Sequence, residues 1–273
     1  MIPVYVSNGA FITRNNGRDY HLIDKYPRML EADGVEFLMY FVWSDEVKEL
    51  RRFLKGTRLY FPVTHMDKQI GETLSEFGLE GREKAMALFR RDLETACEIG
   101  SKKLVLHLWN GPHSDENFDA SLELYEEMHE LAAREGILLT TENVTCIKNV
   151  CLDHLKKMHR LFPFARFTYD TKMAHLHGEN ELLETEKYVN LLSSGVICHL
   201  HMNDSDILPD MSRLPIMHIG EGKVDFGRVF SLLKQIGYCG TATVESTSVN
   251  PDGSVDVEKL QRSINRVRAG LNG

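Results

Sequence analysis

Short runs of β-branched and aliphatic residues alternate along the chain with longer amphipathic segments, and the alternation repeats eight times. Apolar runs of about four to eight residues are typical of buried strands, whereas apolar residues three or four positions apart are typical of helices packed on a core. Strands that alternate with amphipathic helices in this way indicate a parallel sheet with helical crossovers.

The pattern predicts where each element lies. The expected strands are 3–6, 34–38, 58–64, 103–107, 137–142, 165–170, 196–202 and 241–245. The expected helices are 21–31, 44–55, 80–99, 117–134, 149–160, 181–192, 226–236 and 257–267, with a long polar connection before the third. No linker rich in proline, glycine or serine divides the chain. We therefore predict one domain over residues 1–273, folded as a single (β/α)8 TIM barrel.

Composition and charge narrow the setting. The 273 residues are 42% hydrophobic, which is enough for a large core, and the formal net charge is −8. Nucleic-acid and membrane-surface partners usually require a basic patch, so we expect neither. The five cysteines include no Cys-x-x-Cys pair, and we find neither a signal peptide nor an apolar run of about 18 residues. A soluble protein of the reducing cytoplasm fits these features best.

Four candidate metal ligands stand at or near the carboxyl ends of consecutive expected strands: Glu142, Asp170, His201 and Glu245. In a (β/α)8 barrel these ends open on one face, so the four side chains are expected to meet. Three carboxylates that lie close together repel unless a cation sits between them. We therefore predict one divalent metal ion, and the donor set suits Mn²⁺, Mg²⁺, Co²⁺ or Zn²⁺. Taken singly, each acid could instead cap a helix or bond a loop amide.

The segment 197–206 carries a His-x-His pair into this expected centre. Because side chains on a strand alternate with a period of two, His199 and His201 share a face, with His201 nearer the carboxyl end. We assign His201 to the metal and expect His199, one pleat deeper, to be structural. An isolated pair of this kind can also consist of two satisfied core imidazoles.

Several short motifs, in this order, resemble the xylose isomerase-like TIM barrels. They are GVEF at 34–37, ENV at 142–144, YDT at 169–171, HMND at 201–204, IGEGKVDF at 219–226 and GYCG at 237–240 followed by Glu245. Each motif alone is weak, but the set covers nearly the whole chain and is specific at the level of the superfamily. That superfamily holds sugar-phosphate isomerases and epimerases and also the class II AP endonucleases.

The resemblance implies that the four residues ligate the metal as in the epimerases, and that Glu142 and Glu245 also transfer protons. A hydroxycarbonyl substrate that chelates a metal has an acidified α C–H, and its enediolate is stabilised. Two carboxylates on opposite faces of that carbon could remove and return the proton. We therefore predict an isomerase or epimerase of a small sugar or other polyhydroxy-carbonyl compound.

Substrate contacts are expected from His65, His107, Trp109 and His175. His65 and His107 match strand-end histidines of the family, although both could be neutral imidazoles packed beneath the loops. His175 is one of the two imidazoles nearest to Met173, which occupies the place of a histidine that commonly follows the aspartate in these enzymes. No Gly-rich phosphate cradle is recognisable, which favours a substrate without phosphate.

Aromatic residues fall just after several expected strands, where loops form the mouth of a barrel. They are Phe11, Tyr40, Trp43 and Trp109. They could stack on a sugar ring, cover the end of the barrel or form a subunit contact in a homo-oligomer.

Other functions stay open. A related lyase or dehydratase would use the same metal and base, and would differ only in the position of the leaving group. An AP endonuclease-type phosphoesterase shares the fold but conflicts with the acidic charge. It also conflicts with Leu214 and Ile216, which stand where that class carries the Asp-x-His pair for a third zinc. A binding barrel without catalysis would hold no metal.

Overall fold

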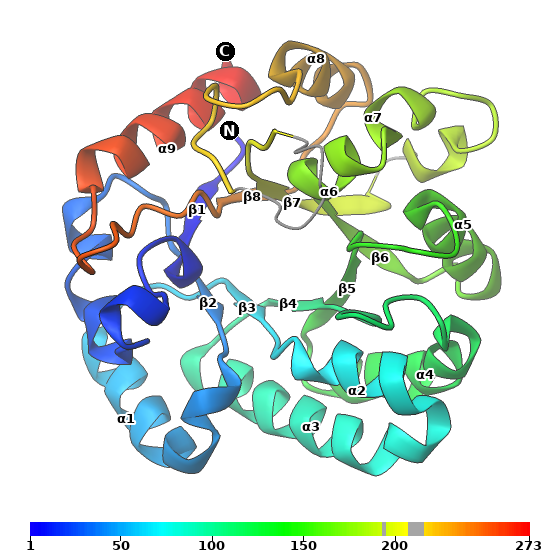
Figure 1. The fold of residues 1–273 in the computed structure, drawn as a ribbon, viewed down its shortest axis with the longest axis horizontal. Helices are drawn as coiled ribbons and strands as arrows, with labels where there is room; N and C mark the ends of the chain where they lie inside the picture. The colour runs from blue at the N-terminus through cyan, green and yellow to red at the C-terminus, as the bar shows by residue number, and fades with distance from the viewer. Residues whose placement is uncertain (193–194, 207–215) are drawn as a thin grey trace.

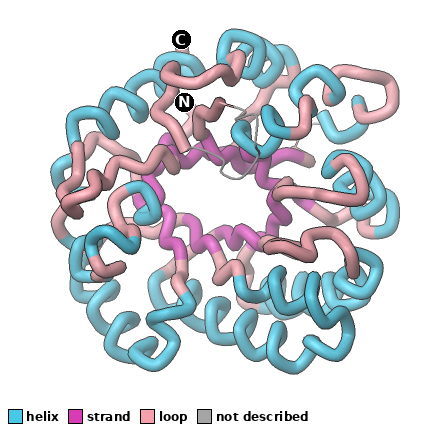
Figure 2. The backbone as a smooth tube through the Cα atoms, viewed as in Figure 1, coloured by secondary structure: helices cyan, strands magenta, loops and turns pink. Residues whose placement is uncertain are grey.

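The computed structural model describes residues 1–192, 195–206 and 216–273. Eight parallel strands close into a barrel in sequence order, with the eighth paired to the first. Figure 2 shows the strands as an inner ring and the helices outside it. The predicted (β/α)8 barrel is confirmed.

The strands are short and almost entirely buried, as the apolar runs predicted. They are β1 Val4–Ser7, β2 Val35–Leu38, β3 Val63–His65, β4 Lys103–Leu106, β5 Leu138–Glu142, β6 Arg166–Asp170, β7 Ile197–Met202 and β8 Thr241–Val244. The third strand begins later than expected. Arg58 adopts a left-handed conformation (φ 56°) at the end of the preceding helix, and Pro62 has no N–H to donate to a ladder.

The helices surround the strands (Figure 1). They are α1 Val47–Thr57, α2 Gln69–Phe77, α3 Arg82–Ile99, α4 Phe118–Arg134, α5 Cys151–Leu161, α6 Thr171–Leu176, α7 Glu179–Leu182, α8 Phe226–Gln235 and α9 Val257–Asn272. Among the described residues, none of these helices combines the length and the hydropathy that a bilayer span requires.

Helix α2 lies where the sequence predicted a polar connection. Its apolar stripe is short, with Ile70 and Leu74 fully buried four positions apart. Gly71 faces the end of β4, and a Cβ there would lie 2.5 Å from the carbonyl oxygen of His107. Because α2 contains a glycine and many polar residues, its sequence did not show the apolar periodicity that predicts a helix.

Two other predicted helices are shorter than expected. Residues 21–31 form two 3-10 turns, Tyr20–Asp24 and Pro27–Met29, because the proline cannot supply the N–H that a continuous helix needs. Of the segment 181–192, the structure shows only the end of α7 and a 3-10 turn at Val189–Leu192.

The helix predicted over 44–55 does not begin at Ser44. Ser44 lies within a 3-10 turn, Phe41–Glu46, and its hydroxyl donates a hydrogen bond to the carbonyl oxygen of Phe41 at 2.6 Å. Helix α1 begins three residues later, at Val47.

The strand register brings the ends of β5 to β8 to one level. Asp170 pairs with His201, His201 pairs with Thr243, and Glu142 pairs with Thr168 one strand away. Glu245 directly follows β8. Parallel pairing without a large offset therefore places all four predicted ligands at the same end of the barrel.

Gly71→Ala should destabilise the protein, because the new methyl group would collide with the backbone at the end of β4. We expect the free energy of unfolding in urea to fall by about 1–3 kcal/mol. The matched control is Gly56→Ala in α1, where nothing lies within 4 Å and alanine should stabilise the helix by up to about 1 kcal/mol. Wild-type stability in Gly71→Ala would contradict the close approach of α2 to β4.

Candidate active site

His201 stands at the centre of the candidate site. Its imidazole is fully buried, and Nε2 lies 2.9 Å from Oε1 of Glu36, which rises from β2 on the opposite side of the barrel. Nδ1 points the other way, 3.2 Å from Oε1 of Glu142 and 3.5 Å from Oε2 of Glu245. This Nδ1 forms no hydrogen bond within the described residues. A ring nitrogen that is buried among carboxylates without a hydrogen bond is placed as a metal ligand would be.

Asn203 links two of the strand-end acids. Its Nδ2 donates to Oδ2 of Asp170 and to Oε2 of Glu245, both at 3.1 Å. Candidate donor atoms of Asp170, His201 and Glu245 all lie within 4.8 Å of one another. Asp170 also caps α6, because its Oδ1 accepts from the backbone N–H of Met173 at 2.9 Å. The alternative role foreseen for a strand-end acid therefore coexists here with a place in the cluster.

Glu142 is held by two further imidazoles. Its Oε2 lies 2.9 Å from Nε2 of His107 and 3.3 Å from Nε2 of His65. The second nitrogen of each ring also has a protein partner, the carbonyl oxygen of Met66 for His65 and the side chain of Asn110 for His107. In this arrangement both imidazoles contact Glu142, and their contact with a substrate stays a prediction.

The buried charges shift the ionisation of the cluster. Burial raises the pKa of Asp170 to about 6, and the neighbouring Glu142 and Glu245 add to the rise. Burial opposes ionisation of Glu142 as well, but His201 and His107 hold its pKa well below the usual range. Burial alone would lower the pKa of His201, yet the three surrounding carboxylates raise it well above the ordinary value. The carboxylates that stabilise the proton on His201 would also stabilise a divalent cation, so the proton and the cation compete for this position.

The residues present fit a divalent cation. Glu142 and Glu245 approach the free Nδ1 of His201, and Asp170 lies in one group with His201 and Glu245. A further carboxylate already orients the imidazole from its far side. Such a carboxylate–histidine relay is the usual support of a metal-bound histidine. We propose that Glu142, Asp170, His201 and Glu245 hold one metal ion, as the sequence predicted.

Glu36 is the main residue of the site that the sequence analysis missed. It is fully buried, and its Oε2 accepts from Nε2 of His199 at 2.9 Å and from Oγ1 of Thr243 at 2.6 Å. The other nitrogen of His199 bonds Oγ1 of Thr241 at 2.6 Å, and burial lowers the pKa of His199 to about 3. His199 therefore lies below the acids as a neutral, satisfied imidazole. The sequence feature that could have revealed Glu36 is its charge, because it is an acidic residue within an otherwise apolar strand.

The sequence of the chain matches a known protein family. Residues 28–268 match the family described as xylose isomerase-like TIM barrel. The chain belongs to this family. An uncharacterized protein of Methanocaldococcus jannaschii is 27% identical over 181 residues, which are 62% of this chain and 58% of that protein. The match thus spans little more than half of the length of this relative.

Several solved structures share the fold at low identity. D-allulose 3-epimerase from Methylomonas sp., in complex with D-allulose, has a TM-score of 0.71 at 18% identity over 98% of this chain and 96% of that one. L-ribulose 3-epimerase has 0.71 at 14% identity over 99% and 95%. The IOLI protein with a zinc atom has 0.67 at 15% identity over 99% and 98%. At these identities the likeness establishes the fold alone.

A cavity of about 760 Å³ opens beside the acids. Its lining comes from loops after several strands and includes Arg18, Tyr40, Lys68, Gln69, Glu245 and Thr247. The guanidinium of Arg18 lies 5.0 Å from the centre of the Tyr40 ring, and the Tyr40 hydroxyl donates to the Ile12 carbonyl oxygen. Of the four aromatic residues that could line the mouth of the barrel, Tyr40 lines this cavity, and the other three are not among its lining residues.

Trp109 does not stand where the sequence predicted. Its indole is fully buried and packs edge-on against Phe118 and His154, and it is not among the residues that line the cavity. The residue follows β4 by only three positions, so the chain has not yet left the core. His175 lies half-buried on α6, and its contact with a substrate stays a prediction.

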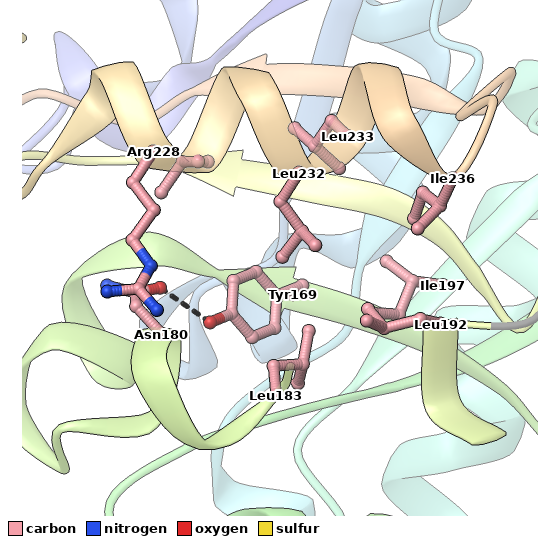
Figure 3. Close-up of a pocket in the computed structure, with 10 residues that line it drawn as sticks. Tyr169, Asn180, Leu183, Leu192, Ile197, Arg228, Leu232, Leu233 and Ile236 are labelled. Carbon is pink, nitrogen blue, oxygen red and sulfur yellow. Dashed lines mark hydrogen bonds between the residues drawn. The ribbon is translucent and has the colours of Figure 1, made fainter. Parts of the chain in front are cut away.

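A second pocket lies outside the barrel, between α8 and strands β6 and β7 (Figure 3). Tyr169 projects into it and donates to Oδ1 of Asn180 at 2.6 Å. Its neighbour Asp170 instead belongs to the cluster with His201 and Glu245. Apolar side chains make up most of the lining, and the space is about 10 Å³, the lower limit for a single water molecule. It is a small gap in the packing between helix and sheet, too small for a substrate.

The carboxylate of Asp204 holds the Gly-Glu-Gly turn at 220–222. Both carboxylate oxygens of Asp204 accept backbone N–H groups, among them those of Gly220, Gly222 and Val224 at 2.8–3.0 Å. His218 bonds the hydroxyl of Ser263 at 2.9 Å. Of the two positions that argued against a third zinc, Leu214 lies outside the described residues, and Ile216 is an exposed apolar residue.

Metal binding should depend on Glu245 and on pH. Elemental analysis of purified protein should find one divalent ion per chain, and Glu245→Gln should lower that content because the amide is a weaker ligand. Affinity should fall as the pH drops, because His201, whose pKa is raised, takes up a proton that competes with the cation, and Asp170 then protonates through about pH 6. Glu179→Gln, a buried substitution outside the cluster, serves as control. Equal metal content in Glu245→Gln and wild type would remove Glu245 from the ligand set.

Glu36→Gln should weaken metal affinity about 10- to 100-fold, because an amide cannot accept from His199, His201 and Thr243 as the carboxylate does. Titration against a chromophoric chelator measures the change. His199→Gln should lower the free energy of unfolding more than the metal affinity. If His199→Gln instead lost metal while Glu36→Gln kept it, the orientation assigned to His201 would be wrong.

Proposed function

We propose that the protein is a metal-dependent isomerase or epimerase of a small sugar or related polyhydroxy-carbonyl compound. Proton transfer at a carbon beside the carbonyl is assigned to Glu142 and Glu245. The metal is proposed to be Mn²⁺, Mg²⁺, Co²⁺ or Zn²⁺, which the mixed oxygen and nitrogen donor set accommodates.

One observation carries the proposal: two glutamates approach the same atom, Nδ1 of His201, from strands that are not neighbours. Glu142 ends β5 and lies 3.2 Å away, whereas Glu245 follows β8 and lies 3.5 Å away. A substrate carbon held between the two carboxylates would have a base on either side. That arrangement suits removal of a proton from one face and its return to the same or the other face.

The two glutamates differ in setting, which supports different tasks. Glu142 is fully buried and stays ionised because His201 and His107 lower its pKa. Glu245 has 18% of its side chain exposed and lines the cavity, so it meets an entering substrate first. His65 and His107 are positioning residues that fix the Glu142 carboxylate. When bound, a divalent cation would polarise the substrate carbonyl and stabilise the negative charge that develops on its oxygen.

The comparisons support a sugar as the class of ligand. Solved structures that share the barrel include D-allulose 3-epimerase and L-ribulose 3-epimerase, and the former holds D-allulose. The size of the cavity beside Glu245, about 760 Å³, is sufficient for a monosaccharide. We infer a sugar or polyol as the ligand class on these grounds.

Exchange with solvent deuterium tests the chemistry. Wild-type protein with saturating metal, incubated with a panel of ketoses and inososes in D₂O, should incorporate deuterium at a substrate C–H that NMR detects. Glu142→Gln should slow this exchange by at least about 10²-fold, the lower range for loss of a general base. Glu179→Gln is the matched control: burial raises the pKa of Glu179 to about 8, so the amide mimics its neutral form.

The outcomes separate the candidates. Deuterium in substrate or product without loss of water supports the isomerase or epimerase, whereas loss of water would identify the related dehydratase. Nearly full exchange in Glu142→Gln with metal bound would mean that Glu142 is not the base, and the two-glutamate mechanism would be abandoned.

A further inference from the structure

A pair of cysteines lies in the connection that follows β5. Cys146 is in the loop and Cys151 is the first residue of α5, and their sulfur atoms are 2.6 Å apart. Both thiols are free and buried, and both sulfur atoms lie against the carbonyl oxygen of Val144, with Cys146 at 3.5 Å. Val144 follows Glu142 by two residues, so the pair is attached to the backbone of the candidate active site.

An imidazole on α5 adjoins the first of these thiols. His154 lies one turn into the helix, and its Nε2 is 2.8 Å from Oδ2 of Asp115. Candidate ligand atoms of Asp115, Cys146 and His154 lie within 4.8 Å of one another. The four side chains thus form a series of carboxylate, imidazole, thiol and thiol. A nucleophile beside a base that a third group orients is the arrangement of an activated thiol.

Asp115 is a positioning residue with no oxygen to spare for a cation. Its Oδ1 accepts the N–H groups of Ile147 at 2.8 Å and Lys148 at 3.0 Å, and its Oδ2 accepts those of Asn149 and His154. These bonds hold the loop and keep the carboxylate ionised. A metal would have to displace them, so the geometry favours thiol chemistry over ion binding.

The electrostatics agree with an activated thiol. The hydrogen bond from Cys151 lowers the pKa of Cys146 to about 7, and His154 contributes in the same direction against the effect of burial. Burial opposes protonation of His154, but Cys146 and Asp115 raise its pKa above the ordinary value. Cys151 differs, since burial and the adjacent Cys146 raise its pKa well above the usual range. One thiol is thus prepared to attack, and the other stays protonated until it is needed.

We propose that Cys146 and Cys151 form a peroxide-reactive dithiol, with His154 as the base and Asp115 as its positioning residue. The Cys146 thiolate attacks one oxygen of a hydroperoxide, the O–O bond breaks, and the alcohol or water leaves with the proton from His154. Cys146 becomes a sulfenic acid. Cys151 then attacks that sulfur, forms the S–S bond and expels hydroxide, which takes the Cys151 proton and leaves as water. Two thiols and one hydroperoxide give one disulfide, one alcohol (water when the oxidant is hydrogen peroxide) and one water.

The sequence allows a direct test by mass spectrometry. Trypsin cleaves after Lys148, so Cys146 and Cys151 fall in separate peptides, 135–148 and 149–156. After treatment of the holoprotein with one equivalent of hydrogen peroxide, non-reducing digestion should yield these two peptides joined. Dithiothreitol should separate them again. Cys97 and Cys239, which are exposed, provide the internal control and should stay alkylatable.

Substitution on α5 tests the role of the imidazole. At pH 7, a thiol with a pKa near 7 should react roughly three- to tenfold faster than an ordinary cysteine. His154→Gln should slow disulfide formation by no more than that factor, because the hydrogen bond from Cys151 makes the larger contribution to the lowered pKa of Cys146. His159→Gln on the same helix should leave the rate unchanged. Cys151→Ser should stop at the sulfenic acid, which a dimedone probe labels on Cys146.

Two results would overturn the proposal. The first is wild-type protein in which Cys97 or Cys239 oxidises while both members of the pair remain alkylatable. The second is a metal ion that protects the pair from alkylation and is lost in Cys146→Ser, which would identify the cluster as a metal site. Neither result depends on the activity of the barrel, so failure here leaves the proposed isomerase chemistry untouched.

Discussion

The orientation of one imidazole depends on a carboxylate buried beneath it, and the candidate site depends on that orientation. Glu36 accepts from Nε2 of His201, which leaves Nδ1 directed at Glu142 and Glu245. Glu36 belongs to β2 and His201 to β7, so the contact exists only because the barrel closes. Loss of either partner would leave the other buried with one partner fewer, which destabilises a buried polar network. The ligand geometry and the closed fold therefore support each other.

The buried Glu36 carboxylate requires hydrogen-bond donors, which explains why the barrel interior around it is polar. Glu36 also accepts from His199 and Thr243, so three donors satisfy one fully buried carboxylate. Below this group, Nζ of Lys103 donates to Oγ1 of Thr241 at 2.7 Å and to the Cys198 carbonyl oxygen at 2.8 Å. A satisfied polar network of this kind is rigid, because each group loses a partner if another moves. Rigidity beneath His201 is what a metal ligand requires.

The sequence predicted what depends on local periodicity and missed what depends on contacts across the barrel. The strand ends at Glu142, Asp170 and His201 follow from apolar runs and a period of two. Glu36 lies 165 positions from His201 in the sequence, and the residues around Glu36 do not indicate which residue it contacts. The contact between Cys146 and Cys151 is local, but a spacing of five residues matches no common motif. Helix α2 was missed for a different reason, a stripe of only two fully buried aliphatic residues broken by a glycine that the close approach to β4 requires.

The central claim is that Nδ1 of His201 and the strand-end carboxylates bind one cation. Anomalous diffraction from crystals grown with Mn²⁺ tests it most directly. The account predicts a single strong peak about 2 Å from Nδ1 of His201, with oxygens of Glu142, Asp170 and Glu245 around it. A peak on the Nε2 side of His201, or at Asp115, Cys146 and His154 with none beside His201, would contradict the account.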